Sequence, residues 1–266
     1  MRITALNVFP IKGCRGTSLA SCEVDRLGLV GDRRLMLVDA GDQFISQREN
    51  PRLATLEPVL TNGSVRISSG SGEALEVSID ASGPARSVSV WAHDGIIAAD
   101  QGDRAADWFS AAIGQECRLV YFGPQAHNRI DPQYSPRSDA ETAFTDGYPI
   151  TAVLQESLDD LNRRLAEPIP MARFRPSIVV SGAPAWSEDG WRSVAFGDLH
   201  CDVVKPCARC TVTTTDQRTG ARDPAQEPLR TLATFRTIPG LGAIFAQNVV
   251  PRARGMLRVG DAVVPA

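Results

Sequence analysis

The sequence lacks any long apolar run. No window comes near the roughly 18 unbroken apolar residues of a membrane-spanning helix, and the opening segment MRITALNVFPIKGCRG has neither the apolar core nor the cleavage pattern of a secretory signal. These absences predict a cytoplasmic protein with no membrane partner. In that reducing compartment we expect its six cysteines to remain thiols, available for metal or redox chemistry.

A basic surplus is also missing. The formal net charge is −3, so the chain does not show the clustered positive charge that phosphate backbones require, and we expect no nucleic-acid partner. Aromatic residues are few, at 6%, but 43% of the residues are hydrophobic and 22% are charged. This balance is typical of a globular chain with a buried core.

What is present is a series of short strand-like segments. The segments 34–39 and 43–48, 64–69 and 74–80, and 87–100 alternate apolar and polar residues and are broken by turn residues, which predicts hairpins. The third hairpin is expected to turn at Asp94-Gly95, a dipeptide suited to positive φ angles. Few helices are expected among these strands, so we predict a mainly β fold of the α+β class that begins with a barrel or curled sheet.

Three helices are predicted. One follows Asp103 as its N-cap and closes at Gly114, a second runs from Ser157 to just before Pro168, and a third covers 227–236 with Pro228 in its first turn. Residues 123–142, rich in Pro, Ser, Asp and Arg, show no periodicity and predict a loop or linker.

The strongest chemical signal is Cys207-Ala208-Arg209-Cys210, followed by TVTTTD. A zinc site needs two more ligands, and the neighbouring His200 and Cys201 would point to opposite faces of a strand. A thioredoxin-like dithiol should open a helix, whereas the Thr-rich run favours a strand. A buried structural pair remains possible, and so does a single thiolate bound to a soft metal, which Lys205 and Arg209 would favour electrostatically.

Several further blocks of the sequence, together with the CARCTVTTTD block, resemble one known family. From VFPIKGCRG through DRRLMLVDAGDQFISQRENPRL, AFTDGYPITAVLQESLDDLN and RFRPSIVVSG to IFAQNVV and RVGDAV, the chain is similar to the MOSC family. The likeness is to the branch that contains the mitochondrial amidoxime-reducing component, in which an N-terminal β-barrel domain packs on a MOSC β-barrel domain. It implies a first domain over 1–122, a linker over 123–142 and a MOSC domain over 143–266.

The resemblance also implies a molybdenum cofactor, in which a phosphorylated pterin carries the metal. Cys210 would be the metal ligand and the catalytic residue. The residues implied in cofactor binding are Lys12, Gly13, Arg33, Gly147, Tyr148, Arg175, Ser177, Ala208, Arg209, Cys210 and Asn248. At 147, 148, 177 and 208 the residue types differ from those of the eukaryotic relative. Asp146 is a lesser candidate, and Asp216 suits either a turn or an active site.

The implied activity is reduction of small N-hydroxylated compounds, with the cofactor supplying the chemistry. The cysteine run of a plant-type ferredoxin is missing, which implies an external electron donor of ferredoxin, flavodoxin or cytochrome type. The chain is also too short for the pyridoxal-dependent domain of cofactor sulfurases. A non-catalytic carrier of the cofactor or of sulfur would use the same cysteine and is the alternative.

Overall fold

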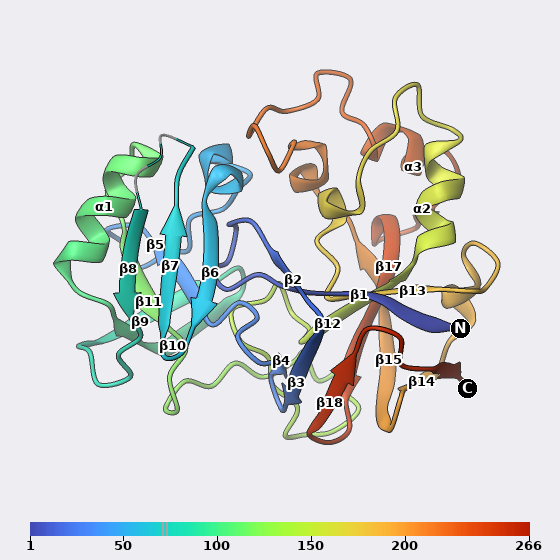
Figure 1. The fold of residues 1–266 in the computed structure, drawn as a ribbon, viewed down its shortest axis with the longest axis horizontal. Coiled ribbons are helices and arrows are strands. Elements are labelled where there is room, and N and C mark those ends of the chain that lie inside the picture. Colours follow the sequence, from blue (N-terminus) through green and yellow to red (C-terminus); the bar gives the residue numbers. More distant parts are fainter. Residues whose placement is uncertain (71, 73) are drawn as a thin grey trace.

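A computed structural model describes residues 1–70, 72 and 74–266 (Figure 1). Most of the regular structure is β-strand: β1 (Arg2–Val8), β2 (Thr17–Leu19), β3 (Ser21–Asp25), β4 (Gly28–Leu29), β5 (Leu35–Val38), β6 (Glu57–Thr61), β7 (Ser64–Ser68), β8 (Ala74–Ser78), β9 (Ala85–Val90), β10 (His93–Asp100), β11 (Arg118–Tyr121), β12 (Ile150–Leu154), β13 (Ile178–Ser181), β14 (Ser193–Phe196), β15 (Leu199–Ala208), β16 (Thr237–Ile238), β17 (Gly242–Pro251), β18 (Gly255–Arg258) and β19 (Val263–Pro265).

The helices are short. They are α1 (Asp103–Ile113), α2 (Gln155–Asn162) and α3 (Leu229–Phe235), with the 3-10 helices η1 (Pro51–Thr55), η2 (Met171–Phe174), η3 (Ser187–Gly190) and η4 (Thr211–Thr214). The prediction of a mainly β chain with a few helices is confirmed. Each predicted helix exists, but with other bounds: α1 begins at Asp103 itself with Gly102 as its N-cap, α2 runs from Gln155 only to Asn162, and Pro228 is the N-cap of α3.

The elements form two halves that lie side by side (Figure 1). The first half holds β5 to β11 with α1, and the second holds β1 to β4 and β12 to β19 with α2 and α3. Separate clusters of buried apolar side chains fill the two halves. No helix among the described residues is both long and apolar enough to cross a bilayer.

A large sheet organises the second half, in the order β19-β14-β15-β17-β12-β13-β1-β2. Strand β1 pairs antiparallel with β13, which sets Leu6 opposite Ile178. Lys12 lies six residues after Leu6, and Arg175 lies three residues before Ile178. The register therefore brings the chain after β1 and the chain before β13 to the same edge of the sheet.

The first half contains two of the three predicted hairpins. In the remaining one, 43–48 forms no strand and meets β5 only in an isolated bridge between Val38 and Phe44, and the strand that pairs with β5 is β11. Strands β7 and β8 pair antiparallel, and residues 71 and 73 of their connection lie outside the described part of the chain. Strands β9 and β10 also pair, but the expected turn at Asp94-Gly95 is wrong. The turn is formed by Trp91 and Ala92, and Gly95 lies in an irregularity of β10 with a positive φ of 74°. The Asp-Gly dipeptide thus serves a bulge, which also needs positive φ.

The strand expected after Cys210 is also wrong. Thr211–Thr214 is the single turn of η4. The carbonyl of Cys210 accepts hydrogen bonds from both the backbone nitrogen and the hydroxyl of Thr213, at 3.0 and 2.9 Å, and the Thr214 hydroxyl donates to the Thr211 carbonyl. These local hydrogen bonds from threonine hydroxyls satisfy the backbone without a strand partner, and so override the β propensity of the run.

Candidate functional site

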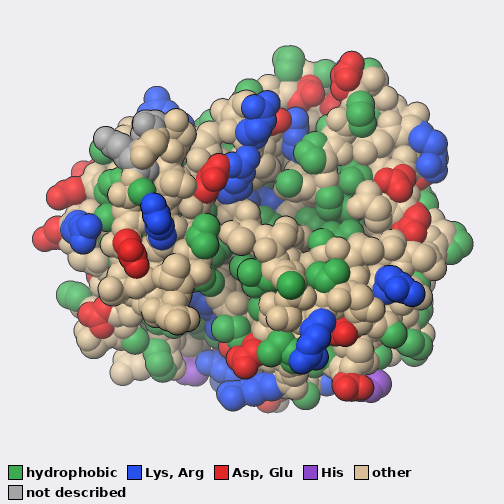
Figure 2. All heavy atoms as spheres, in the orientation of Figure 1, with side chains coloured by type: hydrophobic (Ala, Val, Ile, Leu, Met, Phe, Trp, Pro, Cys, Tyr) green, Lys and Arg blue, Asp and Glu red, His purple; other side chains and the backbone are tan. Residues whose placement is uncertain are grey.

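A cavity of about 390 Å³ opens where the two halves meet, and Figure 2 shows it as a hollow with Lys and Arg side chains at its edge. Among the described residues that line it, six are basic and one is a carboxylate, Asp146. The basic residues are Lys12, Arg33, Arg48, Arg175, Lys205 and Arg209. Because the whole chain carries net negative charge, this positive excess is local to the cavity.

The cavity gathers ten of the eleven residues that the resemblance singled out. They are Lys12, Gly13, Arg33, Gly147, Tyr148, Arg175, Ala208, Arg209, Cys210 and Asn248. Ser177 does not line the cavity. It is fully buried behind Arg33, where its hydroxyl accepts a hydrogen bond from the guanidinium at 3.3 Å. Ser177 can therefore act on the cavity only indirectly, through the residues that it holds, Arg33 and Thr151.

Lys12 lies in the turn after β1, with 8% of its side chain exposed. Its ammonium donates to Asp146, and it lies 4.9 Å from the centre of the Phe44 ring. Burial lowers the pKa of Lys12, the positive charges of Arg33 and Arg175 lower it further, and Asp146 counteracts part of this effect. The carboxylate thus helps to keep a buried lysine charged.

Asp146 precedes β12 and points into the cavity. Enclosure by the cavity walls opposes its ionisation. However, the charge of Lys12 and the hydrogen bonds from Lys12 and the Trp91 indole outweigh that effect, so the pKa of Asp146 lies well below its usual range. Asp146 is therefore ionised at neutral pH.

Arg33 and Arg175 are linked directly. The Arg33 guanidinium donates to the carbonyl of Arg175 at 3.1 Å and pairs with the buried carboxylate of Asp32. Both guanidiniums lie over the ring of Phe9, at 4.3 and 4.2 Å from its centre. Both arginines have positive φ, 48° and 52°, a conformation that few non-glycine residues adopt. Such backbone strain is found where function requires a fixed side-chain position.

Arg175 forms no ion pair with a carboxylate among the described residues. Its Nη1 donates to Gln217 at 3.2 Å, while its Nη2 is buried and has no hydrogen-bond partner among the described residues. Burial and repulsion from Arg33 lower the pKa of Arg175 to about 9. It stays protonated at neutral pH. A buried, unpaired guanidinium is costly, so this position favours an anion that the chain itself does not supply.

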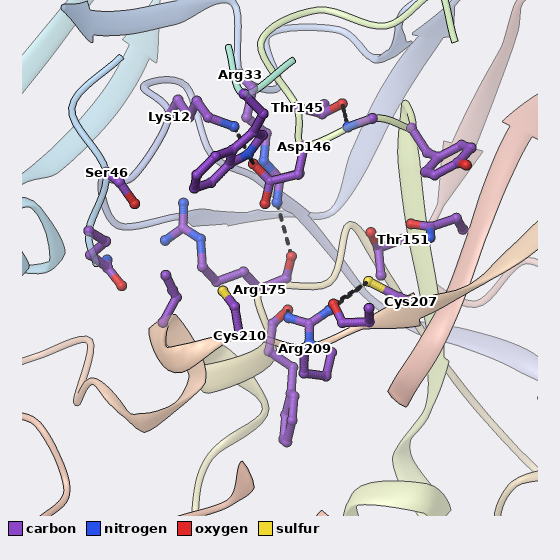
Figure 3. Close-up of a pocket in the computed structure, with 18 of the residues that line it drawn as sticks. Lys12, Arg33, Ser46, Thr145, Asp146, Thr151, Arg175, Cys207, Arg209 and Cys210 are labelled. Atoms are coloured by element: carbon purple, nitrogen blue, oxygen red, sulfur yellow. Dashed lines mark hydrogen bonds and ion pairs between the residues drawn. The ribbon is translucent and has the colours of Figure 1, made fainter. Parts of the chain in front are cut away.

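Cys210 stands between the end of β15 and η4 and caps that 3-10 helix. Its thiol lines the cavity, and no hydrogen bond to it is found among the described residues. In Figure 3 the Arg175 side chain lies between the Lys12–Asp146 pair and Cys210. The sulfur is thus available to a ligand in the same space as the cations.

Cys207 is held differently. The guanidinium of Arg209 donates to its sulfur at 2.8 Å and to the Phe174 carbonyl at 2.6 Å, as Figure 3 shows for the sulfur. Lys205 lies over the Tyr134 ring at 3.8 Å. We expected Lys205 and Arg209 to act on Cys210, but their contacts lie elsewhere. Arg209 donates to Cys207, and Lys205 lies over the ring of Tyr134 in the linker.

The remaining cysteines and Asp216 have structural roles. Burial raises the pKa of Cys14 and Cys201 to about 12, and that of Cys22 to about 11, so these thiols stay protonated. Asp216 accepts hydrogen bonds from the backbone of Arg218 and Thr219, which is a turn geometry, and it does not line the cavity. The turn interpretation is the one that these contacts favour.

The donor set suits one thiolate on a metal that brings its own anionic ligand. Within the described ranges, no group of three or more His, Cys, Asp or Glu side chains is placed to hold a metal ion, so the zinc interpretation lacks its ligands. The free sulfur of Cys210, the cations around Arg175 and the unpaired Nη2 together fit a phosphorylated cofactor that carries a soft metal.

Residues that the sequence reasoning did not select complete the cavity. Trp91 lines it from the β9–β10 turn, with Arg48 over its ring at 4.1 Å. Gln47 lines it too and pairs with Gln217 behind Arg175. Gln47 and Arg48 belong to the block FISQREN, which the resemblance included without assigning a residue. Trp91 lies in no such block and gave no signal.

Two family models match most of the chain, and curated relatives match it over nearly its full length. Residues 1–116 match the family described as MOSC N-terminal beta barrel domain, and residues 139–264 match the MOSC domain. The chain is 32% identical to mitochondrial amidoxime-reducing component 1 of Mus musculus, over 98% of this chain and 81% of that protein. It is 34% identical to mitochondrial amidoxime reducing component 2 of Rattus norvegicus, over 96% and 80%. The YUAD protein of Bacillus subtilis shares 11% identity at a TM-score of 0.42, over 98% and 93%.

Proposed function

Because the chain belongs to the MOSC family, we propose that it binds the molybdenum cofactor in this cavity and reduces N-hydroxylated compounds there. One observation carries the proposal. The free sulfur of Cys210 lines the same cavity as Lys12, Arg33 and Arg175, so a metal ligand and an anion site face one space. The names of the mouse and rat relatives refer to amidoxime reduction, which supports the substrate class.

Each residue has a distinct part in the proposed site. Cys210 would ligate the metal, and Lys12, Arg33 and Arg175 would hold the phosphate by charge-assisted hydrogen bonds. Gly13, Gly147, Tyr148, Ala208, Arg209 and Asn248 line the walls and would contact the pterin. Burial raises the pKa of Tyr148, so its hydroxyl stays protonated and can donate a hydrogen bond. When bound, the cofactor supplies two-electron oxygen-atom transfer.

The proposed reaction converts an N-hydroxyl compound to the parent amine or amidine and water, and it consumes two electrons and two protons. The electrons would come from an external donor of ferredoxin, flavodoxin or cytochrome type. The cationic cavity suits a neutral hydroxylated substrate and repels the protonated product, which assists its release. We place this activity in the cytoplasm, on the sequence evidence alone.

Metal and pterin analysis tests the proposal. The holoprotein should contain molybdenum and pterin, Cys210→Ser should lose the metal, and the matched variant Cys207→Ser should keep it. With a strong artificial reductant, the holoprotein should convert benzamidoxime to benzamidine. Bound cofactor without turnover of amidoximes, hydroxylamines or N-hydroxylated bases would favour the carrier function instead. Absence of pterin from protein purified from a cofactor-producing host would contradict both the reductase and the cofactor carrier, and would favour the sulfur carrier.

A further inference from the structure

Among the described charged residues that line the cavity, Asp146 is the single negatively charged one. Its side chain is 69% exposed to the cavity, whereas the side chain of its partner Lys12 is only 8% exposed. A carboxylate in this position occupies space next to the cations where an incoming anion would bind. None of the cofactor contacts proposed above uses this carboxylate.

Two hydrogen bonds hold Asp146 in place. Its Oδ1 accepts from the Lys12 ammonium at 2.5 Å and from the Trp91 indole at 2.9 Å. Both donors belong to other segments of the chain, and Trp91 is 41% exposed in the β9–β10 turn. Since Asp146 is the exposed member of the pair and Lys12 is the buried one, Asp146 is the residue that can turn away.

The charges around Asp146 do not balance. Lys12, Arg33 and Arg175 bring three positive charges, while Asp32 pairs with Arg33 and Asp146 with Lys12. Among the described residues, no carboxylate forms an ion pair with Arg175, and its Nη2 lacks a hydrogen-bond partner. The positive charge of Arg175 is therefore left without a paired negative charge.

We propose that Asp146 is an internal counter-anion of the phosphate subsite, which neutralises Lys12 until a phosphate dianion displaces it. This inference rests on the proposed cofactor site. A monoanion can replace the charge of Asp146 but leaves Arg175 uncompensated. A dianion replaces Asp146 at Lys12 and supplies the charge that Arg175 lacks. Asp146 thus makes the subsite selective for doubly charged oxyanions over chloride or carboxylates.

Calorimetric titration of cofactor-free protein with inorganic phosphate at pH 7.5 tests the inference. Asp146→Asn removes the competing charge and keeps the shape, so phosphate should bind about tenfold tighter than to the wild type, the equivalent of one charge-assisted hydrogen bond. Asp139→Asn is the matched control, since it removes one negative charge from an 83% exposed side chain. That control should leave the affinity unchanged.

Two results would overturn the inference. Weaker binding by Asp146→Asn would make Asp146 a supporting residue for Lys12, and equal binding would place it outside the subsite. Asp146→Ser provides a second variant should the first fail to fold. Formate at matched ionic strength should not compete with phosphate in the wild type and should begin to compete in Asp146→Asn. Because these titrations use neither metal nor substrate, their outcome is independent of any reductase assay.

Discussion

Gln47 and Gln217 hold each other by two reciprocal amide hydrogen bonds of 3.1 and 3.0 Å across the junction of the two halves. Both side chains are buried. Gln47 also donates to the Gly13 carbonyl at 2.8 Å, and Gln217 accepts from Arg175 at 3.2 Å. One amide pair therefore connects the turn that carries Lys12, the loop after η4 and Arg175, which has no ion-pair partner among the described residues.

Replacing Gln217 with Ala should destabilise the protein by about 1–3 kcal/mol, because buried polar groups of Gln47 and Arg175 lose their partner. Phosphate should also bind more weakly, since Arg175 is no longer held. Urea unfolding and phosphate titration measure the two effects. Gln155→Ala is the control, as its side chain donates to the exposed Asp159 on the same helix, α2. Equal stabilities of the two variants would contradict the role of the amide pair.

The charge on Lys12 should give phosphate binding an alkaline limit. Burial, Arg33 and Arg175 hold its pKa below the ordinary lysine value of 10.5, despite Asp146. The ammonium is therefore lost as the pH rises through that lowered value, and phosphate affinity should fall before an exposed lysine would titrate. Titrations between pH 7 and 10.5 measure this effect. Lys12→Arg keeps its charge and should lose less affinity than the wild type over that range, the remaining fall coming from Arg175, whose pKa is about 9. Coincident profiles would rule out Lys12 as the titrating group.

Arg209→Lys should cost about 1–2 kcal/mol of stability, since a single ammonium cannot replace a guanidinium that donates to both the Cys207 sulfur and the Phe174 carbonyl. The molybdenum content of the purified protein should fall as well, because the segment before Cys210 loses its anchor. Denaturant unfolding and metal analysis check these outcomes. Arg218→Lys, at an exposed position of the same region, should change neither. A fully loaded and stable Arg209→Lys variant would refute the anchoring role.

Asp100 should be the most important carboxylate for the stability of the first half. Its side chain is 4% exposed and accepts hydrogen bonds from Arg118 and from the backbone of Gly102. Removing its charge leaves Arg118 without its main partner, so Asp100→Asn should lower the free energy of unfolding by about 3 kcal/mol. This is the lower end of the range for broken buried ion pairs, because Arg118 is partly exposed. Asp103→Asn removes the 88% exposed partner of the same arginine and should cost less than about 1 kcal/mol.

The Asp100 carboxylate should also make the stability of the protein fall at acid pH. Burial opposes ionisation of Asp100, but Arg118, Gly102 and Arg86 outweigh it and hold its pKa below the ordinary aspartate value of 3.8. Because the pKa of Asp100 is lower in the folded state, its charged carboxylate stabilises the fold at pH values above its unfolded-state pKa. That stability is lost as the pH falls through its folded-state pKa. Unfolding free energies measured between pH 5 and 2 should therefore fall less steeply in Asp100→Asn than in the wild type. Parallel curves would contradict this assignment.

Local signals in the sequence were sufficient to predict secondary structure where apolar residues recur at helical spacing or a capping residue ends a helix. The apolar spacing around Phe109 and the closing Gly114, which has a φ of 68°, define α1 from neighbouring residues alone. The same reasoning failed at Thr211–Thr214, because β propensity describes a residue that has a strand partner. There the threonine hydroxyls found backbone acceptors in their own turn instead.

By itself, the sequence determined the strand-rich class, the helices and, through its motifs, ten of the residues that meet in the cavity. The tertiary structure alone decided which of them touch. The pairing of β1 with β13 brings Lys12 and Arg175 to one edge, the meeting of the halves sets Gln47 against Gln217, and Arg209 turns to Cys207. These contacts join segments far apart in the chain, so burial and charge balance in the folded state select them, and no local pattern encodes them.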